Sequence, residues 1–285
     1  MGIKCGKEDI KNDIKYDYKK PQINNKVIRD RFSTYEQLEE ELRNFGLESS
    51  NLIIGIDFTK SNSWNGNGGP GYYPNDNLHS LYPSPNLYEQ VITLMGHTLE
   101  NFDDDKLIPA YGFGDESTKD KSVFSFLRDS VTGFDCPCHT FAQVLDMYKL
   151  MVNDIASGKL KMSGPTSFAP IINKAIEIVQ ATNSYHILLI IADGEINDKQ
   201  RTIDAIVRAS KYPLSIVCVG VGRANFDMME NLDDDIPDRD FDNFQFVNFY
   251  KTMRYCENLP VEFARHALME IPDQYNYIKK HILYK

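Results

Sequence analysis

Five oxygen-bearing side chains have the types and positions needed to hold a metal ion: Asp57, Thr59, Ser61, Thr166 and Asp193. Each either follows a run of apolar residues or precedes a predicted helix. Two carboxylates together with hydroxyl groups are a ligand set that suits Mg²⁺ or Mn²⁺, whereas a dedicated Ca²⁺ site would use more carboxylates. These residues therefore predict a site for a hard divalent cation, with Mg²⁺ or Mn²⁺ favoured over Ca²⁺.

Two apolar runs, 51–56 and 186–192, must bring these residues together. They are rich in Ile and Leu and do not alternate with polar residues, which is typical of strands buried on both faces of a parallel sheet. The carboxyl ends of such strands meet at one edge of the sheet, where ligands bind in open α/β folds. The sequence therefore predicts a doubly wound, mainly parallel α/β sheet with the five residues at its carboxyl edge.

The other predicted elements alternate between helices and strands, as this fold class requires. Ser33 with Glu36, and Asn86 with Glu89, form capping boxes that begin two helices. We expect further helices near 141–151, 199–210, 226–232 and 260–270, one with Pro170 in its first turn, and a short final helix. We expect further strands near 107–113, 214–220 and 244–249, an antiparallel edge strand near 123–126, and a loop over 129–140.

Length and composition indicate one large globular domain with an N-terminal extension. The chain has 285 residues, 42% hydrophobic residues and a net charge of -10. We expect a flexible arm over 1–31, a domain over 32–285 that begins with a helix at 32–46, and a helical extension over 257–285. The acidic charge argues against a nucleic-acid-binding protein, which needs a basic surface to contact phosphates.

Cysteine usage and the N-terminus bear on localisation. Five cysteines at irregular spacing favour a reducing compartment, so we expect a cytoplasmic protein, with the plasma-membrane periphery and the nucleus as alternatives. Gly2 and Cys5 are candidate sites for myristoylation and palmitoylation, although position 6 is Gly where the acylation motif has Ser or Thr. The alternative is a charged, disordered tail without lipid.

The five residues resemble the metal-ion-dependent adhesion site of von Willebrand factor A domains, with Thr59 in place of the commoner serine. Further motifs are similar to the copine-type A domain, and the resemblance covers roughly residues 34–278. These motifs are Leu47–Asn51, Tyr111–Asp115, Leu160–Pro170, Tyr212–Ile216, Asp242–Phe249 and Ala267–Pro272. The resemblance implies an A-type α/β fold in which the five side chains hold a cation and a partner's Asp or Glu completes its coordination.

The amino-acid sequences of these motifs are most similar to those in the A domain of plant-type RING ubiquitin ligases. Animal copines carry paired C2 domains ahead of this domain, and the ligases carry a RING after it. This sequence contains neither a C2-sized region before position 34 nor paired Cys/His ligands for a RING. We therefore expect a non-enzymatic, metal-dependent protein-binding adaptor, with the substrate-recruiting part of a ubiquitin ligase as the alternative. A metal-dependent hydrolase is a remote alternative, because no residue stands out as a general base.

Overall fold

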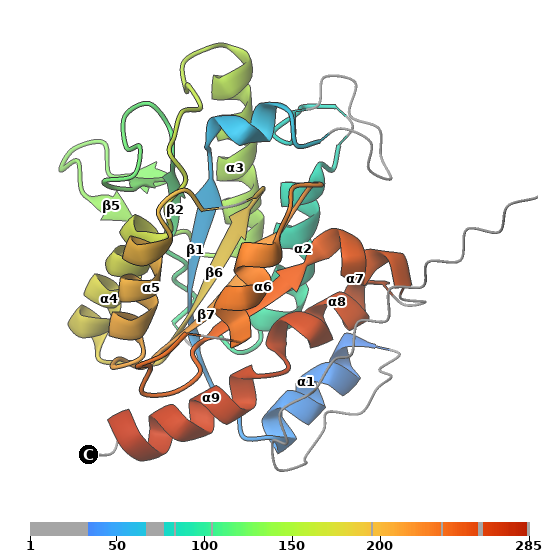
Figure 1. Ribbon diagram of the computed structural model, residues 1–285, viewed down its shortest axis with the longest axis vertical. Coiled ribbons are helices and arrows are strands. Elements are labelled where there is room, and N and C mark those ends of the chain that lie inside the picture. Colours follow the sequence, from blue (N-terminus) through green and yellow to red (C-terminus); the bar gives the residue numbers. More distant parts are fainter. Residues whose placement is uncertain are drawn as a thin grey trace, which may run out of the picture.

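The centre of the molecule is a six-stranded sheet that is parallel except at one edge (Figure 1). The computed structural model describes residues 34–66, 77–82, 84–103, 105–194, 196–234, 236–255 and 259–283. The strands are β1 (Asn51–Asp57), β2 (Ala110–Phe113), β3 (Phe124–Ser125), β6 (His186–Ala192), β7 (Leu214–Gly220) and β8 (Phe244–Asn248). Their order is β3-β2-β1-β6-β7-β8, and β3 pairs antiparallel to β2. The predicted doubly wound α/β sheet and its antiparallel edge strand are therefore confirmed.

Helices cover both faces of the sheet. They are α1 (Tyr35–Asn44), α2 (Leu87–Leu99), α3 (Phe141–Ala156), α4 (Ala169–Thr182), α5 (Lys199–Ala209), α6 (Asp227–Asp234), α7 (Phe249–Tyr255), α8 (Leu259–Leu268) and α9 (Ile271–Ile278). A short 3₁₀ helix η1 (Lys60–Ser63) follows β1, and a π-helical turn η2 (Lys279–Leu283) follows α9. Figure 1 shows α4 and α5 on one side of the sheet and α2 and α8 on the other.

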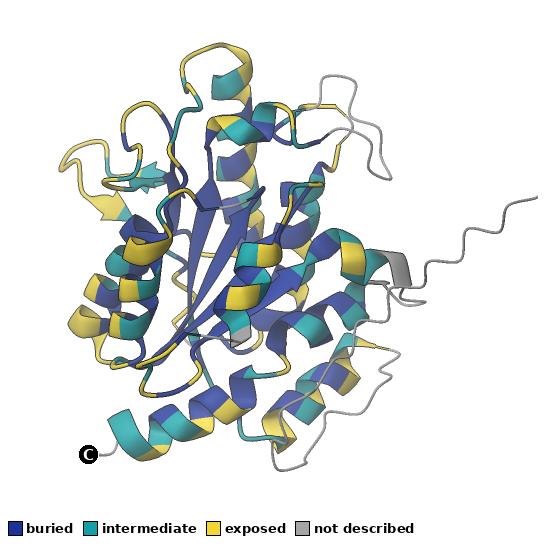
Figure 2. Cartoon of the chain, in the orientation of Figure 1, coloured by how far each residue is buried: buried dark blue, intermediate teal, exposed yellow. Residues whose placement is uncertain are grey.

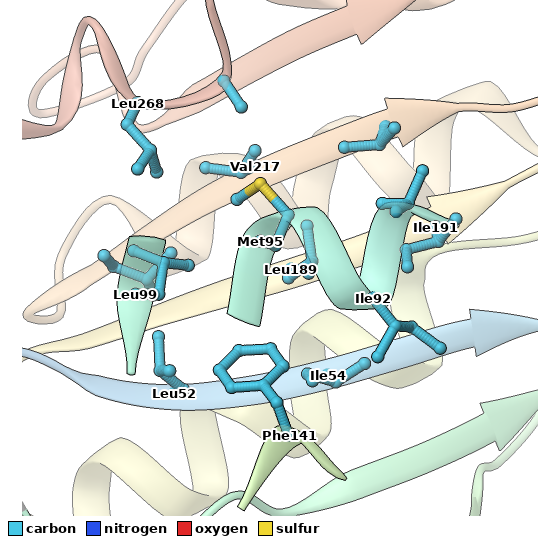
Figure 3. Close-up of a cluster of buried hydrophobic side chains, with 14 of the residues drawn as sticks. Leu52, Ile54, Ile92, Met95, Leu99, Phe141, Leu189, Ile191, Val217 and Leu268 are labelled. Carbon is cyan, nitrogen blue, oxygen red and sulfur yellow. The ribbon is translucent and has the colours of Figure 1, made fainter. Parts of the chain in front are cut away.

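Alternate residues of the central strands supply two separate apolar cores, one on each face of the sheet. In β1, Leu52 and Ile54 point into the core formed with α2, α3 and α8, while Ile53 belongs to the core under α4 and α5. This follows from the two-residue period of a strand. Figure 3 shows the first core, with Met95 of α2 and Leu268 of α8 packed over the strands. Burial on both faces explains why these strands lack polar alternation (Figure 2).

The helix-capping predictions were half correct. Asn86 and Glu89 form a reciprocal capping box at the start of α2, as expected. The N-cap of α1 is Thr34 and not Ser33, because the Thr34 hydroxyl accepts the hydrogen bond from the backbone N–H of Gln37. Ser33 lies outside the described residues. Adjacent hydroxyl residues offer the same chemistry, so the sequence alone could not choose between them.

Several expected boundaries were wrong. β2 has four residues and begins at Ala110, α3 extends to Ala156, and Phe249 starts α7 and is not the end of β8. The segment predicted as loop contains β5 (Asp135–Cys136), which pairs with β4 (Leu127–Arg128) in a small hairpin. Strands of two residues are too short to give a periodic pattern.

Within the predicted helical extension over 257–285, the described residues 259–283 contain α8, α9 and η2, and α9 contacts the end of α1. The side-chain amide of Asn276 in α9 donates to the carbonyl oxygen of Phe45 at 2.9 Å. The predicted arm over 1–31, with the candidate lipidation residues Gly2 and Cys5, lies outside the described residues. Across the part of the chain that the structure describes, no helix combines the length and apolar character required for a membrane span.

Candidate metal centre

The proposed site lies where the strand order of the sheet reverses. β1 and β6 are neighbours, and their pairing ends with Ile56 opposite Ile191. Asp57 is the last residue of β1, and Asp193 follows the last residue of β6. β2 then lies on one side of this pair and β7 on the other, so the two carboxylates sit at a topological switch point, the usual ligand position in such sheets.

A chain of hydrogen bonds joins the four predicted residues at the carboxyl ends of these two strands and in the turn that follows β1. The backbone N–H of Thr59 donates to Asp57 Oδ1 at 2.7 Å, and the hydroxyls of Thr59 and Ser61 are 3.0 Å apart. The Ser61 hydroxyl in turn donates to Asp193 Oδ1 at 2.9 Å. The structure therefore brings two carboxylates and two hydroxyls into one connected cluster.

The fifth predicted residue, Thr166, lies on a separate loop that borders the same cavity as the cluster. The backbone N–H of Lys60 donates to the carbonyl of Ser163 at 2.6 Å, which places this loop beside η1. Asn197 fixes Thr166 by accepting from its N–H at 2.7 Å and donating to its carbonyl at 2.9 Å. Thr166 lines the same cavity of about 560 Å³ as Thr59 and Ser61. All five residues are thus at one edge of the sheet.

Burial dominates the electrostatics of the two carboxylates. Both side chains are buried. Desolvation, followed by the negative charge of Asp193, raises the pKa of Asp57 well above its usual value. Desolvation also raises the pKa of Asp193, although hydrogen bonds from Ser61 and Asn65 partly oppose the increase. Ionising both of these neighbouring buried carboxylates costs free energy unless a positive charge compensates for them.

The oxygen atoms of the site fit a hard divalent cation. Asp57 Oδ2 is buried and has no hydrogen-bond partner among the described residues, so one carboxylate oxygen remains available. Within those same residues, no three His, Cys, Asp or Glu side chains gather as a metal cluster. A cation at this site would therefore depend on hydroxyl oxygens in addition to the two carboxylates. This set suits Mg²⁺, which proteins usually bind through only one or two carboxylates.

Gly114 allows the loop after β2 to pass close to the site. A Cβ atom at this position would lie 2.3 Å from Thr59 Cγ2 and 3.4 Å from Asp57 Oδ1. The residue also has a φ of 85°, which favours glycine. The position therefore requires glycine for both steric and conformational reasons.

A buried polar network supports the backbone beneath the site. His79 Nε2 lies 2.8 Å from the carbonyl oxygen of Asp57, and Nδ1 lies 2.9 Å from the Tyr148 hydroxyl. Burial lowers the pKa of His79 to about 3, so its ring is neutral near pH 7. Because a carbonyl can only accept, Nε2 carries the proton and donates, and Nδ1 accepts from Tyr148. Asn62 adds donations to the carbonyls of Asp57 and Thr59 and accepts from Tyr88.

Sequence reasoning missed the residues that orient the five proposed ligands. Asn65, whose amide donates to Asp193 Oδ2 at 3.0 Å, lies in the same segment as Ser61 and could have been suspected from its position. Asn197, His79 and Tyr148 are distant along the chain from the residues they contact. Their roles depend on tertiary contacts, for which the sequence has no periodic signal.

Comparison with known proteins supports the resemblance noted in the sequence. A family model described as Copine matches residues 77–285. The E3 ubiquitin-protein ligase RGLG2 of Arabidopsis thaliana is 51% identical over 264 residues, which cover 87% of this chain and 54% of that protein. Copine family protein 2 of Caenorhabditis elegans is 46% identical over 250 residues, covering 87% of this chain and 3% of that protein. The chain spans about half the length of the Arabidopsis relative.

Among solved structures, the SpRpn10 VWA domain aligns with a TM-score of 0.45 at 12% identity, covering 70% of this chain and 87% of that one. The A-type α/β class itself is visible in the parallel sheet, its strand order and its two helical layers. The family model matches well over half of the chain, through the C-terminal helices as well as most of the sheet. The chain belongs to the copine family.

Proposed function

We propose that this chain is a metal-ion-dependent protein-binding module that captures an acidic side chain of a partner protein. In this proposal Asp57, Thr59, Ser61, Thr166 and Asp193 hold Mg²⁺ or Mn²⁺, directly or through water. The observation that carries the proposal is the buried carboxylate of Asp57, whose free Oδ2 lies in a cluster linked by hydroxyls to Asp193. The membership of the copine family and the matching adhesion-site motif support it.

The charges of the cluster explain why the partner should be acidic. Two carboxylates balance the charge of a dication, while the three hydroxyls add oxygen ligands without further negative charge. A bound cation would therefore accept another anionic oxygen at the side that faces the cavity. An Asp or Glu of a partner can supply that oxygen.

The proposal is tested first by metal binding to the full chain. Isothermal calorimetry should detect Mg²⁺ or Mn²⁺ binding to the native protein and no binding to Asp193→Ala, because the variant loses one of two charged ligands. Circular dichroism and the melting temperature should report a folded variant. Asp204→Ala, an exposed aspartate on α5, is the matched control and should bind metal normally. No metal uptake by folded native protein would refute the proposal.

A second candidate function is recruitment of substrates to a ubiquitin ligase. It is supported by the relatives named as E3 ubiquitin-protein ligases, of which RGLG2 is 51% identical to this chain. In this case the chain would bind the substrate through the metal site, and a RING-bearing protein or segment would supply catalysis. With ubiquitin, E1 and E2, the chain alone should form no conjugates. Adding a RING ligase should give conjugation that EDTA and Asp193→Ala both reduce; conjugation insensitive to both would exclude this role.

A further inference from the structure

The wall of the cavity above the proposed metal site contains one large exposed aromatic side chain. Trp64 is the only tryptophan of the chain and is 55% exposed. It lines the same cavity as Thr59, Ser61 and Thr166. A single exposed apolar side chain is ordinary on a protein surface. The position of Trp64, beside the oxygen atoms proposed to bind metal, distinguishes it from the others.

Trp64 is held in place by the same turn that supplies a proposed ligand. Its backbone N–H donates to the carbonyl of Ser61 at 3.0 Å, and the next N–H, that of Asn65, donates to the same carbonyl at 3.1 Å. Asn65 is itself anchored, because its amide donates to Asp193 Oδ2 and its carbonyl accepts from the N–H of Arg223 at 3.2 Å. A backbone fixed in this way loses little freedom when a partner packs on the side chain that it carries.

The cavity is larger than a carboxylate group requires. Its volume of about 560 Å³ falls within the range of roughly 300–1,000 Å³ found for sites that enclose whole small-molecule ligands. Pro165 and Ala224 contribute small apolar surfaces to the wall, and Trp64 contributes the large one. The space can therefore hold side chains that flank the acidic residue of a bound segment.

The charge of the cavity wall is opposite to that of the molecule. The chain has a net charge of -10, yet among the described residues lining the cavity the only charged one is Lys60. Lys60 is exposed and makes no ion pair with another described residue. A cation at the rim attracts acidic segments and disfavours basic ones.

We infer that the cavity binds an acidic peptide segment of a partner, in which a bulky apolar side chain lies within a few residues of the metal-binding Asp or Glu. The apolar side chain packs on Trp64, and Lys60 pairs with additional negative charge. Buried aromatic contacts of this type commonly carry much of the affinity of an interface. This inference rests on the proposed function, which supplies the contact between the carboxylate and the metal.

Trp64 also provides a site-specific fluorescence signal, because no other tryptophan contributes. We propose to titrate the full chain with Mg²⁺ and then with three pools of synthetic peptides. One pool has a central Glu flanked by apolar and aromatic residues, the second has the same Glu flanked by uncharged polar residues, and the third repeats the first with Gln in place of Glu. The first pool should shift Trp64 emission to the blue and protect it from acrylamide quenching, and it should bind roughly tenfold more tightly than the second.

Variants separate the contribution of Trp64 from that of the metal. By calorimetry, Trp64→Ala should keep its Mg²⁺ binding and lose the preference for the first pool over the second. Tyr82→Ala is the matched control, since this aromatic side chain is 74% exposed but does not line the cavity. Lys60→Gln should weaken binding of both Glu pools, and the binding that remains should depend less on salt concentration.

The outcomes distinguish the inference from the proposed function. Equal binding of the first two pools, or an unchanged preference in Trp64→Ala, would overturn the inference and leave the metal-dependent capture of Glu intact. Failure of both Glu pools to bind in the presence of Mg²⁺, or binding of the Gln pool as tightly as the first, would overturn both.

Discussion

Asp57 is costly for the fold, and this cost bears on its proposed role in metal binding. Its carboxylate is buried at the end of β1, and only one of its two oxygens accepts a hydrogen bond from a described residue. A buried polar atom without a partner costs on the order of 1–3 kcal/mol, and more when charged. A bound cation would remove this cost, which couples metal binding to stability.

The first prediction concerns the pH dependence of stability and its change in Asp57→Asn. Because burial and the charge of Asp193 raise the pKa of Asp57, the metal-free folded chain holds a proton that the unfolded chain has lost. The free energy of unfolding of the metal-free protein should therefore fall as pH rises from about 4, the ordinary Asp value, toward the raised pKa. Mg²⁺ should stabilise the protein most at the high end of this window.

Asp57→Asn removes the charge and keeps an oxygen for the Thr59 N–H. Metal-free Asp57→Asn should be about 1–3 kcal/mol more stable than wild type at neutral pH, with a weaker pH slope and no stabilisation by Mg²⁺. Chemical denaturation at several pH values, with EDTA or with Mg²⁺, measures these effects. An identical slope in wild type and variant would contradict the assignment of the titration to Asp57.

The second prediction compares two glycines with positive φ. Gly114→Ala should destabilise the protein by about 1–3 kcal/mol and weaken Mg²⁺ binding, because the added Cβ displaces Thr59. Gly133→Ala is the matched control, since Gly133 has a φ of 71° and no atom lies within 4 Å of the point that an added Cβ would occupy. It should show the conformational cost without a change in Mg²⁺ affinity. Equal effects on Mg²⁺ affinity would show that steric contact with Thr59 is unimportant.

At the scale of elements, helices α2 and α3 position the end of β1. Tyr148 of α3 and Tyr88 of α2 enclose His79, and the three rings pack face to face or at a tilt. Through His79 and Asn62 they reach the carbonyl of Asp57 from below. The loop that carries Thr59 and Ser61 therefore depends on two helices that contribute no proposed ligand.

The third prediction tests this support by removing one hydroxyl. Tyr148→Phe should destabilise the protein by about 1–3 kcal/mol, because His79 Nδ1 loses the hydroxyl that donates to it. It should also weaken Mg²⁺ binding severalfold by loosening the Asp57 backbone. Tyr185→Phe is the matched control: its buried hydroxyl donates to Ser215 at 2.9 Å and lies before β6, at the opposite end of that strand from Asp193. If both variants bind Mg²⁺ equally, the network supports stability alone.

At the scale of the whole molecule, the C-terminal helices complete one core without approaching the proposed site. α9 crosses the lower edge of the sheet in Figure 1, while the strands point their carboxyl ends upward. Ile271, Tyr275 and Ile278 are buried there, and the ring of Tyr275 lies 5.0 Å from that of Tyr185. This end of the molecule therefore contributes to the core, and the proposed metal site lies at the opposite end of the sheet.

The fourth prediction is that truncation after Glu270 lowers the stability of the protein without changing its affinity for Mg²⁺. Removing 271–285 takes three buried apolar side chains from the core, at about 1.5–3 kcal/mol each, so the loss should be roughly 5 kcal/mol or more. Thermal unfolding should report a large decrease in melting temperature. Any folded fraction at low temperature should retain wild-type Mg²⁺ affinity by calorimetry. A selective loss of affinity in folded protein would link α9 to the site.

The sequence by itself determined the sheet and the position of the candidate ligands. Unbroken apolar runs require burial on both faces, and parallel strands place their final residues at one edge, so Asp57 and Asp193 were expected at the same edge of the sheet. The pairing of β1 with β6, which makes the two residues neighbours, came from the tertiary structure. The sequence also shows which candidate ligands carry carboxylate oxygens and which carry hydroxyl oxygens, and these oxygen types predict a preference for a hard cation. These properties follow from local composition and from a geometric rule that holds for every sheet of this class.

Only the tertiary structure decided which side chains hold the site in place. His79, Tyr148 and Asn197 act on residues far away in sequence, and such contacts depend on how helices and loops pack once the sheet has formed. The exposure of Trp64 beside the cavity is likewise a property of the folded surface. Packing and exposure arise from the whole molecule, which is why local pattern could locate the proposed ligands but not their supports.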